Sequence, residues 1–262
     1  MPLMPGAEPY RHDGGEIGVL LCHGFTGSPQ SLRPWGEYLA ERGLTVSLPL
    51  LPGHGTRWQD MQLTGWQDWY AEVDRELHAL RERCSRVFVF GLSMGAALTI
   101  RLAAEHGAAI SGIVLVNPSV KADSAQLKAV PLARHFVPSV KGIASDIAKE
   151  GGVEIGYDRT PLHAVYSMTK FWRIVQADLP KVTQPVLLFN SRVDHVVHPS
   201  NGDLVERRLS STDLTRTMLE HSYHVAPLDN DAEQIFQGSY GFVQRLAPAS
   251  GGEVNEVASG GA

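Results

Sequence analysis

The sequence has little cysteine, no excess of basic charge and no long apolar run. Its 262 residues include only two cysteines, Cys22 and Cys84, and neither belongs to a C-x-x-C pair. Two isolated cysteines cannot form a disulfide framework and do not provide a set of thiolate ligands for zinc. We therefore expect a protein of a reducing compartment, without a structural zinc site.

The balance of charge argues against nucleic acid as a partner. Lys and Arg number 23 against 28 Asp and Glu, which gives a net charge of -5. A chain without a basic field has nothing to hold a polyanion, so nucleic acid is not an expected partner.

The apolar segments are too short to cross a membrane. The longest, Val19–Cys22 and Ile113–Val116, fall far below the roughly 20 residues of a spanning helix. The first ten residues have neither the basic start nor the apolar run of a signal peptide. We therefore expect a cytoplasmic protein, for which peripheral contact with lipid stays open.

Short apolar runs alternate with amphipathic stretches through most of the chain. Such alternation is typical of βαβ units, so the sequence predicts an α/β fold with a mostly parallel central sheet flanked by helices. The predicted strands are Gly18–Cys22, Leu44–Leu48, Arg86–Phe90, Ile113–Val116, Pro185–Phe189 and Leu214–Leu219. The predicted helices are Ser31–Arg42, Trp66–Arg83, Met94–His106 and Asp229–Arg245.

One interval interrupts this alternation. Residues 118–180 show no clear strand and only patchy helical periodicity, and a loop of this length is seldom without structure in a compact domain. We expect a small helical cap inserted over one end of the sheet, with two ordinary crossover helices as the alternative. Residues 1–117 and 181–247 would then form the core, and residues 248–262, which lack an apolar period, a disordered tail.

The sequence G-L-S-M-G at 91–95 lies between a predicted strand and a predicted helix. A sharp strand–turn–helix corner exposes the serine hydroxyl above the sheet, and the flanking glycines remove side chains that would clash there. This context distinguishes the motif from a chance match at the start of an alanine-rich helix. We therefore predict that Ser93 is a nucleophile.

A second motif, H-G-F-T-G at 23–27, follows the first predicted strand. Ester hydrolysis places negative charge on the carbonyl oxygen, and two backbone N–H groups aimed at that oxygen stabilise the transition state strongly. The residue after the nucleophile, Met94, would supply one N–H and Phe25 the other. His23 precedes the nucleophile in the chain, so we expect it to have a structural role.

A serine nucleophile of this type requires an acid and a base later in the chain, in the order Ser, Asp or Glu, His. Asp194 comes just past a predicted strand end, in N-S-R-V-D-H-V-V-H-P, where a carboxylate can orient an imidazole. Asp203 is the alternative, but its position suits the start of the next helix. We favour Asp194.

The candidate bases are the histidines downstream of Asp194. His195 and His198 are too close to it in sequence to come from a separate loop. His221 and His224 follow the predicted last strand, where the base belongs. His224 leads into the closing helix, so we favour it over His221.

Together these motifs resemble the serine-hydrolase branch of the α/β-hydrolases, and more narrowly the bacterial monoacylglycerol lipases and their carboxylesterase relatives. The resemblance spans roughly residues 8–246. It rests on G-V-L-L-C-H-G-F-T-G-S-P at 18–29, P-G-H-G-T at 52–56, G-L-S-M-G at 91–95, D-H-V-V at 194–197 and S-Y-H-V-A-P-L-D at 222–229.

The resemblance implies a set of roles. Ser93 would be the nucleophile, Asp194 and His224 its partners, and Phe25 and Met94 the oxyanion donors. It also implies a small cap over the site, which matches residues 118–180. Within that interval, Glu154 would face the alcohol half of the substrate, with a solvated surface glutamate as the alternative.

We expect a serine carboxylic-ester hydrolase that cleaves monoacylglycerols to glycerol and fatty acid through an acyl-enzyme, without metal or organic cofactor. Its partner would be a small-molecule ester with one acyl chain. A carboxylesterase for other small esters, a thioesterase and an acyltransferase stay as alternatives on the same triad. A non-catalytic binding protein is disfavoured, because such a module has no need of Ser, Asp and His in this order.

Overall fold

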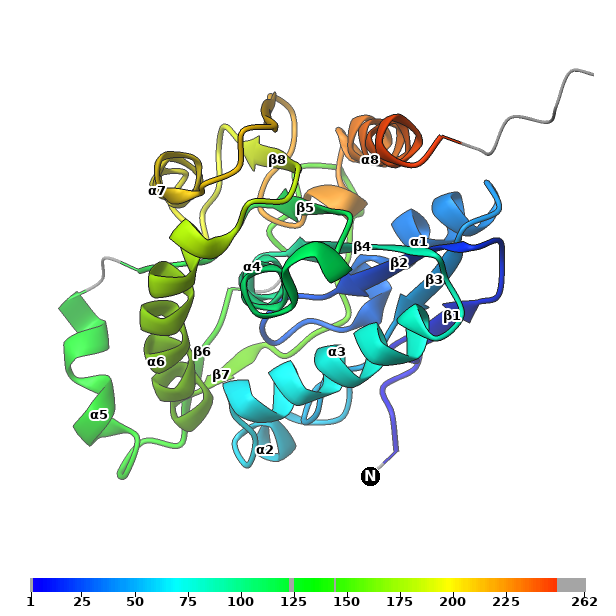
Figure 1. Cartoon of the computed structure of the whole chain (residues 1–262). Coiled ribbons are helices and arrows are strands. Elements are labelled where there is room, and N and C mark those ends of the chain that lie inside the picture. The colour runs from blue at the N-terminus through cyan, green and yellow to red at the C-terminus, as the bar shows by residue number, and fades with distance from the viewer. Residues whose placement is uncertain (1, 123–124, 144, 249–262) are drawn as a thin grey trace, which may run out of the picture.

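The computed structural model describes residues 2–122, 125–143 and 145–248. The predicted disordered tail at 248–262 therefore lies outside the described residues, apart from Pro248. A seven-stranded sheet with the order β1-β3-β2-β4-β5-β8-β9 forms the centre (Figure 1). Its strands are β1 (Tyr10–His12), β2 (Ile17–Cys22), β3 (Thr45–Leu48), β4 (Arg86–Leu92), β5 (Gly112–Val116), β8 (Val186–Ser191) and β9 (Leu214–Leu219).

All pairings in this sheet are parallel except that of β1 with β3. The central strands are buried on both faces, because helices cover the sheet from either side. In β4, Val87 and Val89 belong to one core, whereas Phe88 and Phe90 belong to the other. The predicted α/β architecture with a mostly parallel sheet is therefore confirmed, and the edge strand β1 is an addition to it.

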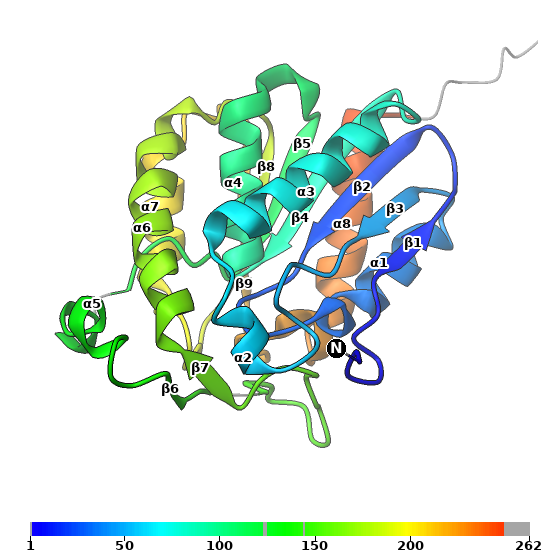
Figure 2. The ribbon, with the colours of Figure 1, turned by 90° about the horizontal axis from the view of Figure 1, so that it is seen from below.

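Two layers of helices enclose the sheet (Figure 2). One face is covered by α1 (Arg33–Ala40) and α8 (Ala232–Leu246), the other by α3 (Trp66–Arg81), α4 (Met94–His106) and α6 (Leu162–Asp178). The remaining α-helices are α2 (Trp58–Met61), α5 (Val130–Ala133) and α7 (Ser200–Arg208). Single 3₁₀ turns are η1 (Pro29–Ser31), η2 (Gly107–Ala109), η3 (Ala125–Lys128), η4 (Leu179–Lys181) and η5 (Ala226–Leu228).

The interval 118–180 holds helical segments, as expected, and also a strand pair that its sequence does not indicate. It contains an antiparallel ribbon of β6 (Ser139–Lys141) and β7 (Arg159–Pro161). Strands of three residues are too short to produce a readable alternation. The long helix α6 at the end of the interval contributes Phe171 and Val175 to the core beside α4. The division into core and cap at these boundaries stays a prediction.

The described ranges contain no helix that is both long and apolar enough to span a bilayer.

Candidate active site

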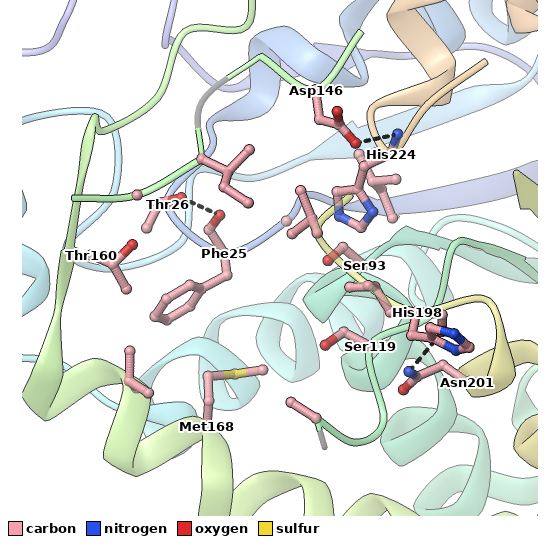
Figure 3. Close-up of a pocket in the computed structure, with 18 of the residues that line it drawn as sticks. Phe25, Thr26, Ser93, Ser119, Asp146, Thr160, Met168, His198, Asn201 and His224 are labelled. Carbon is pink, nitrogen blue, oxygen red and sulfur yellow. Dashed lines mark hydrogen bonds between the residues drawn. The ribbon is translucent and has the colours of Figure 1, made fainter. Parts of the chain in front are cut away.

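A cavity of about 750 Å³ opens at the carboxyl ends of the central strands. Its floor includes Leu92 and Ser93, which end β4 and begin the following turn, and His224 comes from the loop after β9. Residues of the interval 118–180 supply much of its remaining wall, so the cavity lies between the sheet and that interval. Ser93 and His224 are each only 6% exposed. In the view of Figure 3, the imidazole of His224 lies above Ser93.

The backbone of Ser93 is strained, with φ 58° and ψ -115°. Non-glycine residues seldom adopt positive φ, and where they do the surrounding structure holds them there. Two backbone hydrogen bonds fix this corner: the Ser93 N–H donates to the carbonyl of Val116, and the Ser119 N–H donates to the carbonyl of Ser93. Ser93 thus lies between the ends of β4 and β5, as the predicted strand–turn–helix corner requires.

The two glycines of the motif are needed because backbone fills the space beside them. A Cβ on Gly95 would lie 1.8 Å from the carbonyl oxygen of Cys22, and one on Gly91 would lie 2.3 Å from that of Gly95. Neither neighbour can move without moving β2 or α4. The close approach of α4 to β2 therefore depends on these residues having no side chain.

Asp194 and His224 form a hydrogen-bonded pair. The Nδ1 of His224 lies 2.7 Å from Oδ2 of Asp194. The other oxygen, Oδ1, accepts the N–H groups of Val196 at 2.8 Å and Val197 at 2.7 Å, which fixes the carboxylate. An ionised carboxylate only accepts, so Nδ1 of the imidazole carries the proton and Nε2 keeps its lone pair.

Three carboxylates raise the pKa of His224. Burial disfavours the charged imidazole, but the negative charges of Asp194, Glu154 and Asp146 outweigh it, and the pKa of His224 is raised above its usual value. A raised pKa suits a group that must accept a proton and then return it.

The alternative candidates for the acid and the base take part in other contacts. Asp203, in the first turn of α7, accepts a hydrogen bond from Arg216 at 2.8 Å. The His221 N–H donates to Asp231. His195 pairs with Asp146 at 2.8 Å, and Nδ1 of His198 lies 2.9 Å from the hydroxyl of Ser200. The structure therefore brings together the favoured acid and base rather than their alternatives.

Phe25 and Met94 both lie near the nucleophile, since Phe25 lines the same cavity as Ser93 and Met94 follows Ser93 in the chain. Met94 is the first residue of α4, so its N–H has no acceptor within the helix. Phe25 lines the cavity, and its ring packs edge-on against Trp69 with the centroids 5.8 Å apart. In the described ranges no protein acceptor is bound to either N–H. Both groups are thus available to an oxyanion, although their roles stay predictions.

His23 is part of a buried, neutral pair with His54. Its Nε2 accepts the N–H of Leu51 at 3.1 Å, and its Nδ1 lies 3.0 Å from the carbonyl of Gly24. Burial, with the neighbouring His54, lowers the pKa of His23 to about 3, and burial lowers that of His54 to about 4. Neither can act as a base toward the substrate, and both hold the loops after β2 and β3.

Glu154 lines the cavity from the interval 118–180. Its backbone N–H donates to the hydroxyl of Ser145, and its Oε1 lies so near Gly27 that a Cβ there would be 2.7 Å away. Burial raises the pKa of Glu154, although the charge of His224 opposes this. No described residue donates a hydrogen bond to its carboxylate, which leaves that group free for a ligand.

Sequence reasoning missed three residues that organise the site. Asn117, after β5, donates to the carbonyl of His224 at 2.9 Å and accepts the N–H of Ser191 at 2.7 Å. Asp146 accepts the N–H of His224 at 3.2 Å (Figure 3). Asn201 accepts two N–H groups, those of Val120 and Lys121. The pair Asn117-Pro118 at a strand end is the one signal that could have indicated a turn.

Among the described residues, no three His, Cys, Asp or Glu side chains of this cavity have ligand atoms close enough to share a metal ion. The one such cluster found among the described residues comprises Asp74, His78 and His106, none of which lines it.

Known proteins resemble this chain over most of its length. A family model described as "Serine aminopeptidase, S33" matches residues 16–231. The thermostable monoacylglycerol lipase of Bacillus sp. (strain H-257) is 40% identical over 247 residues, which are 94% of this chain and 98% of that protein. The carboxylesterase of Bacillus subtilis (strain 168) is 26% identical, over 91% of this chain and 97% of the relative.

A solved structure from work on LipS and LipT, two metagenome-derived lipolytic enzymes, has a TM-score of 0.91 to this one. It is 40% identical and covers 93% of this chain and 100% of that chain. These similarities confirm the resemblance and the α/β-hydrolase fold that the motifs predict.

Proposed function

This chain belongs to the family of serine hydrolases described as serine aminopeptidase S33, and on that basis we propose that it hydrolyses carboxylic esters, with monoacylglycerols as its substrates. One observation carries the proposal. A serine in a strained turn shares a cavity with a histidine whose other ring nitrogen is bound to a buried carboxylate. That arrangement is the one by which hydrolases of unrelated folds activate a serine.

The reaction would pass through an acyl-enzyme. The Ser93 oxygen attacks the ester carbonyl carbon while Nε2 of His224 takes the hydroxyl proton, and Asp194 stabilises the imidazolium. The C–O bond to the alcohol then breaks, and the glycerol oxygen leaves with the proton from His224. Water, deprotonated by His224 in turn, then attacks the acyl carbon. The bond from that carbon to the Ser93 oxygen breaks, the serine oxygen takes the proton back from His224, and the fatty acid leaves.

The backbone N–H groups of Phe25 and Met94 would bind the oxygen that becomes negative in each step. Such donors act in a site with little water and need no reorganisation during the reaction. Loss of one comparable donor typically costs about 10²–10³ in kcat. The strained turn supports this role, because it places the first N–H of α4 directly after the nucleophile.

The cavity is suited to one acyl chain. Apolar side chains from the core and from α6 line it, among them Phe25, Val165, Met168 and Trp172. Burying a chain gains roughly 0.8 kcal/mol per CH₂. A triacylglycerol would leave two further chains outside a cavity of about 750 Å³, where little burial offsets the cost of ordering them.

Glu154 would receive the glycerol end. Glycerol hydroxyls are donors, and the carboxylate of Glu154 is an acceptor without a donor of its own among the described residues. The charge of Glu154 also contributes to the raised pKa of His224, which supports a position of Glu154 near the reacting end of the cavity.

The cap we propose, residues 121–161, is shorter than the interval 118–180. The cavity-lining residues of this cap fall between Lys121 and Thr160. The helix α6 also lines the cavity, but it packs with α4 in the core and is therefore left out of the cap. Apolar side chains are exposed on this cap, including Leu132 at 70%, Phe136 at 79% and Ile143 at 59%. They support a peripheral contact with lipid, from which a monoacylglycerol could enter.

The cytoplasmic location predicted from the sequence stays a prediction.

The substrate assignment is tested by a matched pair of esters. Initial rates on monolauroylglycerol and methyl laurate, which share the acyl chain, report the alcohol preference, and lauroyl-coenzyme A tests the thioesterase alternative. We expect the glycerol ester to be preferred, and Glu154→Gln to reduce that preference by raising KM for it alone. If Glu154→Gln slows both esters equally, Glu154 does not recognise glycerol. If the thioester is the fastest of the three, the monoacylglycerol assignment is wrong.

A further inference from the structure

A cluster of metal-ligating side chains lies on the helical layer, away from the cavity. Asp74 and His78 are four residues apart on α3, so both project from one face of that helix. His106 is the last residue of α4 and meets them there. The candidate ligand atoms of the three residues all lie within 4.8 Å of one another.

Each oxygen of Asp74 faces a different imidazole. Oδ1 lies 2.6 Å from Nε2 of His106, and Oδ2 lies 3.9 Å from Nε2 of His78. The first contact is a hydrogen bond and the second is too long to be one. The ring of His78 packs edge-on against that of His106, with the centroids 5.3 Å apart. Within the described ranges, the ring of His78 takes part in no hydrogen bond, although it lies beside a carboxylate and a second imidazole.

We propose that Asp74, His78 and His106 form a binding site for Zn²⁺ or a similar divalent transition-metal ion, which links α3 to α4. Two imidazoles with one carboxylate are a ligand set for zinc, cobalt, nickel or copper, whereas calcium and magnesium prefer oxygen alone. Solvent would complete the coordination, because the side chain of His78 is 56% exposed.

The geometry needs only a local adjustment. Zinc lies about 2.0–2.2 Å from nitrogen and carboxylate oxygen, so ligand atoms on one tetrahedral ion are about 3.3 Å apart. The contact of Asp74 with His106 is shorter than this spacing and its contact with His78 is longer. A rotation of the exposed His78 ring toward Asp74 would correct the longer one. Nε2 of His106 must then hold the metal in place of its proton, which moves to Nδ1 or is released.

The site would be structural rather than catalytic, since none of its residues lines the cavity. It would correct the expectation of no structural zinc site, which considered cysteine ligands alone. An ion that binds the folded chain and not the unfolded one stabilises the fold in proportion to the logarithm of its concentration. Both helices cover the same face of the sheet, so the ion would join two neighbouring parts of that layer.

The test is thermal unfolding of the whole chain with EDTA, with ZnCl₂ and with MgCl₂. We expect zinc to raise the midpoint by at least about 2 °C, and magnesium to have no effect. His78→Ala is the informative variant, because it removes a ligand without removing a hydrogen bond. It should unfold near the wild-type midpoint in EDTA and lose the response to zinc.

The matched control is His163→Ala in another histidine pair, His135 and His163, whose ring centroids are 5.8 Å apart. Arg134 rather than a carboxylate contacts His163. That variant should keep the full response, and equilibrium dialysis should show one tightly bound zinc ion per chain that His78→Ala loses. A wild-type protein that zinc does not stabilise, or a His78→Ala variant that responds like wild type, would overturn the proposal.

Discussion

The carboxylate of Asp146 accepts a hydrogen bond from the backbone N–H of His224 at 3.2 Å. The backbone carbonyl of Asp146 also accepts the N–H of Val225. A residue of the proposed cap is therefore bound directly to the loop that carries the proposed base. The same carboxylate pairs with His195 at 2.8 Å, and its side chain is 9% exposed.

We predict that Asp146→Asn moves the acid limb of the kcat/KM profile to lower pH. A base works in its neutral form, so activity falls as pH drops through the pKa of His224. Asp146 is one of the three carboxylates whose charge raises that pKa, together with Asp194 and Glu154. Removing its charge lowers the pKa, so the variant should keep more of its maximal activity in acid. The amide oxygen can still accept the His224 N–H.

Asp229→Asn is the control for this measurement. Asp229 ties the same two segments together, because it accepts the N–H groups of Ala148 at 2.7 Å and Tyr223 at 2.8 Å. Its charge is not among those that shift His224. Its acid limb should coincide with that of wild type. An unmoved limb in Asp146→Asn, or an equal movement in both variants, would show that the charge of Asp146 does not act on the base.

Asp194→Asn should lower kcat by about 10⁴, because the amide cannot hold His224 in the tautomer that leaves Nε2 free. Asp203→Asn is the comparison, since it weakens only the partly exposed contact with Arg216. We expect that variant to lie within about threefold of wild type, as exposed pairs contribute little. Steady-state rates on one soluble ester decide between them. A large loss at Asp203 with a small one at Asp194 would mean that the acid is misassigned.

Gly95→Ala should destabilise the fold by more than about 4 kcal/mol, because the new Cβ would lie 1.8 Å from the carbonyl oxygen of Cys22. Gly241→Ala is the matched control: Gly241 lies in α8 and has nothing within 4 Å of an added Cβ. That change should leave stability unchanged or raise it by about 0.5–1 kcal/mol. Urea unfolding measures both, and equal midpoints would disprove the close packing of α4 on β2.

Where the contacts are local, the arrangement of the candidate site follows from the sequence. The corner around Ser93 follows from a strand, two glycines and a helix that are contiguous in the chain. Asp194 and His224 follow from their places after strand ends, because the carboxyl ends of parallel strands meet at one edge of the sheet.

Contacts between distant segments could not be predicted in the same way. Asp146 lies in an interval without periodicity, and nothing near it in the chain indicates that it reaches the N–H of His224. Asn117 likewise forms hydrogen bonds with Ser191, at the end of β8, and with His224, in the loop after β9. The strands β6 and β7 were missed because three residues pair only once the ribbon has folded.

The central claim, that Ser93 carries the acyl group of a monoacylglycerol, is tested most directly by initial rates on monolauroylglycerol and trilauroylglycerol for wild type and Ser93→Ala. We expect wild type to turn over the monoacylglycerol faster than the triacylglycerol. We also expect Ser93→Ala, folded as judged by circular dichroism, to lose several orders of magnitude of activity, since a triad without its serine retains only about 10³–10⁴-fold catalysis over water. Wild-type turnover by Ser93→Ala would contradict the nucleophile. Equal or faster turnover of the triacylglycerol would contradict a cavity that takes a single acyl chain.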